Sequence, residues 1–177
     1  MTVTDADQAA PTEDVVRELA DKQAIYEVVL RYCRGIDRLD MELVRSCYHP
    51  EGVDNHTGFT GRRDDYVAWV EPLLRRLHGT QHVVANHLVE VDGDRARSET
   101  YGTAYHLART DGSGPGNFTT GFRYVDTMER RDGQWRILDR VAVREWTREE
   151  PDQRPGDPAE GPAMARDRSD PVYRPLR

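Results

Sequence analysis

The sequence predicts an α+β fold in which helices lie on one face of a curved antiparallel sheet. Three observations lead to this class. Over the first part of the 177-residue chain, apolar residues recur at helical spacing. From residue 80 onward they alternate with a period of two, and Asp-Gly pairs separate the alternating runs. Helices that precede a run of strands pack on one face of the sheet, and such packing leaves space for a pocket between the layers.

Three helices are expected in the first half of the chain. Thr12 or Asp14 can cap the first helix, and Gly35 is expected to end it. The second helix is short and ends before Pro50. Pro72 lies inside the third helix and is expected to kink or divide it, because proline removes an intrahelical hydrogen bond. The three helices span Glu13–Gly35, Met41–Tyr48 and Arg63–Leu77.

Five strands are expected as well. A short one, Gly52–His56, precedes the third helix. The other four alternate apolar and polar residues, and the pairs Asp92-Gly93 and Asp132-Gly133 between them are strong hairpin signals. We therefore expect a four-stranded antiparallel meander. Its strands span Gln81–Val91, Arg95–Thr110, Asn117–Glu129 and Gln134–Trp146.

The chain is expected to form one domain with a tail at each end. Residues 1–11 are expected to be a disordered leader, and residues 12–148 to form the folded domain. The segment Glu149–Arg177 is rich in proline and charge, with six of the ten prolines and no apolar period. Because such a segment cannot build a core, it is expected either to be mostly disordered or to lie across a surface of the domain.

Charge and hydropathy argue against several partners. The net charge of −7 argues against nucleic acid, whose phosphate backbone needs concentrated Lys and Arg. No run approaches the roughly 18–20 apolar residues of a membrane helix, and no signal-peptide pattern is present, so we expect a cytoplasmic protein. Cys33 and Cys47 are too few for a disulfide framework and are expected to be buried free thiols.

Several polar residues fall where a covered sheet should carry apolar ones. His82 and Asn86 share a predicted strand face with Val84, so at least one of them is expected to face a cavity. Asp37 follows Gly35 closely and has two interpretations. It either forms a turn or caps the second helix, for which Asp40 is better placed, or it carries chemistry. His82 also has two interpretations. It either carries chemistry or is a core or surface histidine whose hydrogen bonds are satisfied.

No cofactor or metal is expected. The sequence contains no phosphate, nicotinamide or flavin motif, and the glycines of residues 112–116 belong to a hairpin loop. His78, His82 and His87 have spacings of four and five. Because strand alternation would point His82 and His87 to opposite faces, these residues are not expected to bind a metal together.

Three stretches of the chain carry a family resemblance. They are Ala24–Asp40, Gly79–Asn86 and Tyr124–Ile137, and together they resemble the SnoaL-like branch of the NTF2-like superfamily over about residues 15–147. The resemblance implies a cone-shaped α+β barrel, a bent sheet wrapped by about three helices, often paired into a homodimer through the sheet. Among the enzymes of this group, the chain is most similar to scytalone dehydratase, the bile-acid 7α-dehydratases and hexachlorocyclohexane dehydrochlorinase.

The resemblance also implies site residues by motif position. Asp37 falls on the catalytic aspartate and His82 on the catalytic histidine. His56 stands where the dehydratases have a cavity tyrosine, so the substrate contacts differ from those of scytalone dehydratase. Phe122 is a second departure, since scytalone dehydratase has a polar residue there. The further positions that the resemblance implies are Tyr32, His106, Arg140 and Arg144.

These residue types suit an elimination. Neutral imidazole is a base near neutral pH, and a carboxylate on its other nitrogen holds the required tautomer, so Asp37 would orient His82. The expected proton donors to an oxygen are His106, Tyr32 and His56. Residues expected to line the apolar or substrate-binding wall are Trp69, Val84, Asn86, Phe118, Phe122 and Arg144.

We therefore expect a cofactor-independent dehydratase or isomerase that acts on a hydrophobic, polycyclic or aromatic, carbonyl-bearing small molecule. The alternative is a non-catalytic small-molecule-binding or assembly protein with the same fold. The small subunit of a ring-hydroxylating dioxygenase fits less well, because neither it nor a binding protein needs the pair of Asp37 and His82.

Overall fold

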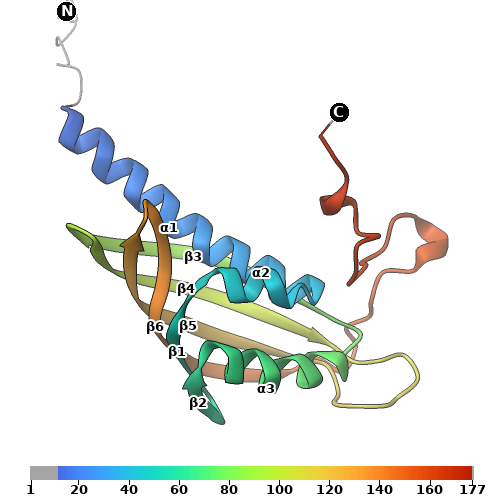
Figure 1. Ribbon diagram of the computed structural model, residues 1–177. Helices are drawn as coiled ribbons and strands as arrows, with labels where there is room; N and C mark the ends of the chain where they lie inside the picture. The colour runs from blue at the N-terminus through green and yellow to red at the C-terminus, as the bar shows by residue number, and fades with distance from the viewer. Residues whose placement is uncertain (1–11, 177) are drawn as a thin grey trace, which may run out of the picture.

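The computed structural model describes residues 12–176 (Figure 1), so the expected leader, residues 1–11, lies outside the described residues. The helices are α1 (Glu13–Arg38), α2 (Met41–Ser46) and α3 (Arg63–Arg75). The strands are β1 (Tyr48–His56), β2 (Phe59–Arg62), β3 (Gly79–Asp92), β4 (Arg95–Leu107), β5 (Phe118–Arg131) and β6 (Gln134–Glu149). Among the described residues, no helix combines the length and apolar character needed to cross a membrane.

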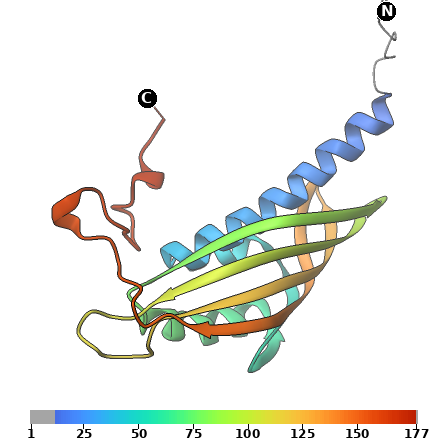
Figure 2. The same ribbon diagram turned by 180° about the vertical axis from the view of Figure 1, so that it is seen from behind.

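The six strands form one open, curved sheet in the order β2-β1-β6-β5-β4-β3. The meander from β3 to β6 is antiparallel, as expected, whereas β1 runs parallel to β6 with Asp54 opposite Arg140. The sheet is therefore mixed rather than purely antiparallel. The sequence pattern does not predict β2, which pairs with the end of β1. α1 and α3 cover one face (Figure 1), while none of the described helices covers the other (Figure 2).

Gly35 does not end the first helix, because it is a packing contact instead. α1 continues to Arg38, and Leu39 ends it in the left-handed conformation with φ 53°. A Cβ on Gly35 would lie only 2.7 Å from Val44 Cγ2, so the glycine allows α2 to approach α1 closely. As a consequence, Asp37 lies in the last turn of α1 and not in the connection after it.

The other two helices also differ from expectation, and both end earlier, α3 at Arg75 instead of Leu77. α2 ends at Ser46, because the carbonyl of Cys47 accepts a hydrogen bond from Ile137 N–H (2.8 Å) and the chain enters the sheet at once. α3 continues through Pro72, since proline costs one hydrogen bond while the buried face of the helix is unbroken on both sides. That buried face consists of Tyr66, Val67, Val70 and Leu74.

A β-bulge in β3 reverses the expected faces of its second half. The pairing with β4 shifts by one residue between Val84 and His87. As a result Asn86 is exposed and lies on the uncovered outer face, so it does not line the cavity as expected. His87 turns inward, where its Nδ1 contacts Thr100 Oγ1 at 2.7 Å, and the expectation that it faces away from His82 is wrong.

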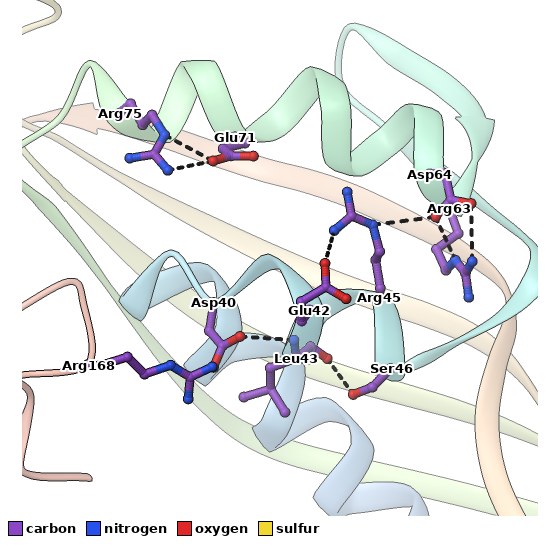
Figure 3. Close-up of polar contacts among 10 residues, drawn as sticks. All are labelled: Asp40, Glu42, Leu43, Arg45, Ser46, Arg63, Asp64, Glu71, Arg75 and Arg168. Carbon is purple, nitrogen blue, oxygen red and sulfur yellow. Dashed lines mark hydrogen bonds and ion pairs between the residues drawn. The ribbon is translucent and has the colours of Figure 1, made fainter. Parts of the chain in front are cut away.

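Polar contacts join α2 to α3 and to the C-terminal segment (Figure 3). Asp40 caps α2 by accepting a hydrogen bond from Leu43 N–H at 3.1 Å. Arg45 of α2 reaches Asp64 in the first turn of α3 at 3.5 Å. Arg168 of the C-terminal segment lies 3.4 Å from the carboxylate of Asp40. Because Asp40 provides the cap, Asp37 is free of that structural role.

The C-terminal segment lies across the domain, which is the second of the two expected arrangements. The hydroxyl of Tyr173 donates to Asp40 at 3.0 Å. The side chain of Met164 packs on Gly79 so closely that a Cβ there would meet the sulfur at 2.2 Å. The segment therefore covers the junction of α1, α2 and the start of β3 (Figure 1).

The core contains a fully buried ion pair between Arg140 of β6 and Asp126 of β5. The guanidinium donates two hydrogen bonds to the carboxylate, at 2.7 and 2.6 Å, and neither side chain has exposed surface. It also lies over the rings of Tyr32 (4.2 Å) and Tyr124 (4.0 Å). Stacking on these rings offsets part of the cost of removing the cation from water.

Loss of one partner of this pair is expected to destabilise the fold strongly. Arg140→Met leaves Asp126 charged, buried and unpaired, which should lower the free energy of unfolding by about 3–5 kcal/mol in urea titrations. The double variant Arg140→Met/Asp126→Leu should recover much of that loss. Arg136→Met is the control, because Arg136 is partly exposed and its guanidinium donates to the exposed Gln134. A loss no larger than that of the control would show that the ion pair is unimportant.

Candidate active site

A cavity of about 330 Å³ lies between α1, α3 and the sheet. Its volume is within the range of small-molecule sites. Most of its lining is apolar or aromatic, and three histidines face it from three different strands. The lining includes Tyr32, His56, Tyr66, Trp69, His82, His106, Phe118, Phe122, Tyr124 and Arg144.

Asp37 of α1 and His82 of β3 form an ionisable pair at this cavity. Asp37 Oδ1 lies 2.7 Å from His82 Nδ1 and also accepts a hydrogen bond from the hydroxyl of Thr80 at 2.9 Å. Asp37 Oδ2 accepts from the backbone N–H of His82 at 2.9 Å. With an ionised carboxylate, His82 Nδ1 must carry the proton, which leaves Nε2 as an acceptor on a ring that lines the cavity.

The C-terminal segment brings a cation near this pair. Arg166 donates to the carbonyl oxygens of Leu74 (2.9 Å) and Leu77 (3.3 Å) at the end of α3. Burial lowers the pKa of Arg166 to about 10, and the nearby Asp37 carboxylate acts in the opposite direction. Arg166 is still charged at neutral pH and adds a cation near Asp37. Asp37 itself is almost fully buried and does not line the cavity.

His106 is a hydrogen-bond acceptor toward the cavity, not a cationic donor. Its ring stacks on Phe118 with centroids 4.0 Å apart, and its Nδ1 donates to the Phe118 carbonyl at 3.3 Å. Burial, together with the nearby His82, lowers the pKa of His106 to about 4. His106 is therefore neutral at neutral pH with Nε2 unprotonated. This corrects the expectation of a protonated donor.

Tyr32 and Tyr66 supply a hydroxyl donor instead. Their hydroxyl oxygens are hydrogen-bonded to each other, and both rings line the cavity. Burial is the main reason why the pKa of each phenol lies well above its usual value, so both stay protonated. One hydroxyl uses its proton in the mutual contact, and the other retains a proton for a ligand.

Asp54 and His56 of β1 form a second Asp–His pair. The two side chains are hydrogen-bonded through His56 Nδ1 and Asp54 Oδ1. The hydroxyl of Tyr48 donates to Asp54 Oδ2 at 2.5 Å. The sequence predicts His56 as a site residue but does not single out Asp54. The available signal was the spacing of two residues on a strand, which places both side chains on one face.

The remaining expected residues divide into two groups. Trp69, Phe122 and Arg144 line the cavity, and Arg144 is exposed and so lies at its opening. Val84 packs against the core instead of the cavity, and Arg140 is in the buried ion pair. Sequence reasoning also missed Thr80 and Tyr66, whose contacts join segments far apart in the chain.

Comparison with known proteins supports this fold. A curated relative, the uncharacterised protein Rv2910c of Mycobacterium tuberculosis, is 24% identical over 132 residues, which cover 73% of this chain and 88% of the relative. A structure of a hexachlorocyclohexane dehydrochlorinase, LinA-type3 from Novosphingobium barchaimii, is similar with a TM-score of 0.66 and 19% identity. That match covers 78% of this chain and 95% of the dehydrochlorinase.

A candidate scytalone dehydratase from Novosphingobium aromaticivorans is similar with a TM-score of 0.68 and 20% identity, over 75% of this chain and 89% of that one. At these identities the solved structures establish the fold. The model of the SnoaL-like domain matches residues 17–141, well over half of the chain. The cone-shaped α+β chain described here therefore belongs to the SnoaL-like domain family.

Proposed function

We propose that the protein is a cofactor-independent dehydratase or isomerase that acts on a hydrophobic, polycyclic or aromatic, carbonyl-bearing small molecule. The observation that carries the proposal is the contact of Asp37 with His82 (2.7 Å) at a mostly apolar cavity. Asp37 accepts three hydrogen bonds, so it orients His82 and is not itself the base. His82 Nε2 then removes a proton from the carbon next to the carbonyl group.

The cavity supports the rest of this reaction. Aromatic walls exclude water, which strengthens the interaction of a developing enolate with hydrogen-bond donors. The spare hydroxyl of the Tyr32–Tyr66 pair can donate to that oxygen. The ring centroids of His106 and His82 are 6.4 Å apart. His106 Nε2 can therefore accept a hydrogen bond from a substrate hydroxyl beside His82. The relatives that are named as dehydratase or dehydrochlorinase are consistent with this chemistry.

Removal of the base is expected to abolish proton abstraction without abolishing binding. The measurement is deuterium uptake from D₂O at the α-carbon of a panel of fused-ring ketones, with a calorimetric titration of the same ketones. His82→Ala should slow uptake by at least about 10²–10⁴-fold. Asp37→Asn should slow it by up to about 10⁴-fold, because the amide no longer holds the tautomer. His87→Gln is the control, since His87 does not line the cavity.

Two outcomes would contradict the proposal in different ways. If His82→Ala exchanges deuterium at the wild-type rate, His82 is not the base. If wild type binds the ketones but exchanges none of them, the alternative of a non-catalytic binding or assembly protein is the better one.

The neutral state of His106 has a measurable effect on stability. Its pKa is about 4 in the folded protein and about 6.5 unfolded, so the unfolded chain binds more protons between these values. Stability from this group is complete above pH 6.5 and declines as the pH falls toward 4. Between pH 7.5 and 4.5, wild type should lose about 2–3 kcal/mol more unfolding free energy than His106→Gln in urea titrations. An equal loss in both proteins would refute a depressed pKa.

For partners, we propose a second copy of the chain on the outer face of the sheet. That face, which no described helix covers (Figure 2), exposes apolar side chains, and the largest are Val83, Leu88, Tyr101, Val141 and Trp146. Light scattering should give twice the chain mass of 20.3 kDa. Val83→Glu/Tyr101→Glu should be monomeric, and the control Val172→Glu, in the C-terminal segment, dimeric. A monomeric wild type would contradict the homodimer.

A further inference from the structure

The cavity has a second Asp–His pair for which the proton abstraction has no use. Asp54 has no exposed surface, and its two oxygens accept from His56 and from the hydroxyl of Tyr48. The His56 ring lines the cavity and stacks on Tyr66, with centroids 5.1 Å apart and planes 23° apart. Because Nδ1 is held by Asp54, Nε2 is the ring nitrogen that a ligand can reach.

The charged groups around Asp54 and His56 differ from those around Asp37 and His82. Asp54 lies opposite Arg140, whose guanidinium already donates two hydrogen bonds to Asp126. The guanidinium is therefore already paired, and Asp54 is a second buried carboxylate beside it. When His56 carries a second proton, the adjacent Asp54 carboxylate stabilises the imidazolium, since a buried charge needs a partner.

The rings of Phe122 and Tyr124 form an aromatic wall, and His82 and His56 lie at its two ends. The ring of His82 lies 5.8 Å from that of Phe122, Phe122 lies 4.5 Å from Tyr124, and Tyr124 lies 6.3 Å from His56. A ligand that stacks on this wall meets an unprotonated Nε2 of His82 at one end. At the other end it meets His56, whose ring stacks on Tyr66.

We propose that His56, oriented by Asp54, is the general acid that protonates the leaving oxygen, directly or through one water. This inference rests on the proposed function, because it needs His82 as the base. His82 Nε2 takes the proton from carbon, and the C–H electron pair becomes the new carbon–carbon double bond. The C–O bond breaks, its electron pair stays on oxygen, and His56 Nε2 gives that oxygen a proton so that it leaves as water. Solvent then returns one proton to His56 and removes one from His82.

The test separates the acid from the base by changing the leaving group. Three probes share one skeleton: a fused bicyclic ketone, its β-hydroxy derivative and its β-chloro derivative. Hydroxide needs a proton to leave, whereas chloride leaves as the anion. His56→Gln should lower the rate of water loss by about 10²–10⁴-fold. It should lower the rates of chloride loss and of deuterium uptake by the parent ketone far less, so that the ratio of water loss to chloride loss falls by about 10²-fold or more.

Each other outcome has a definite meaning. If wild type takes up no deuterium, the proposed function fails before this inference is reached. If wild type is active and His56→Gln slows the loss of water and chloride equally, or slows neither, His56 is not the acid. A loss of deuterium uptake in His56→Gln also overturns the proposal, since His56 would then shape the cavity for the base. Melting curves of His56→Gln and of a second variant, His56→Asn, check that the chain still folds. His87→Gln is the matched control.

Discussion

The buried ion pair of Arg140 and Asp126 is the interaction on which the site depends. A guanidinium without contact with water is tolerated only while its carboxylate and its two aromatic neighbours keep their positions. Those neighbours, Tyr32 of α1 and Tyr124 of β5, also line the cavity. The pair therefore sets how closely α1 approaches the sheet. Asp37 lies further along the same helix, so its distance from His82 depends on that approach.

The sequence predicts what local periodicity encodes and misses what distant contacts decide. The three helices and the antiparallel meander follow from apolar spacing and Asp-Gly turns. Gly35 was misinterpreted as a helix stop because its real constraint, the closeness of Val44, lies in another element. The bulge after Val84 has no signal in alternation, yet it moved Asn86 out of the expected cavity wall and turned His87 inward.

The site shows the same difference between what local sequence patterns predict and what distant contacts decide. Family resemblance placed Asp37 and His82 together, and the structure has them in contact. For Asp54 the resemblance gives no signal, and the spacing of two residues from His56 shows only that the two side chains share a face. Its burial comes from the parallel pairing of β1 with β6, which joins residue 54 to residue 140. That pairing is non-local, and a pattern of alternating residues contains no information about it.

Hydrogen-bonding polarity gives the cavity a direction. At one end, Asp37 holds the proton of His82 on Nδ1 and the Phe118 carbonyl does the same for His106, so both rings present acceptors. At the other end, the buried tyrosines present hydroxyl donors, and His56, held by Asp54, is the acid that we propose. The rings of Phe122 and Tyr124 lie between the two ends. This polarity favours one orientation of a ligand of the proposed kind, with an acidic C–H group and an oxygen that gains charge, as the proposed proton transfer requires.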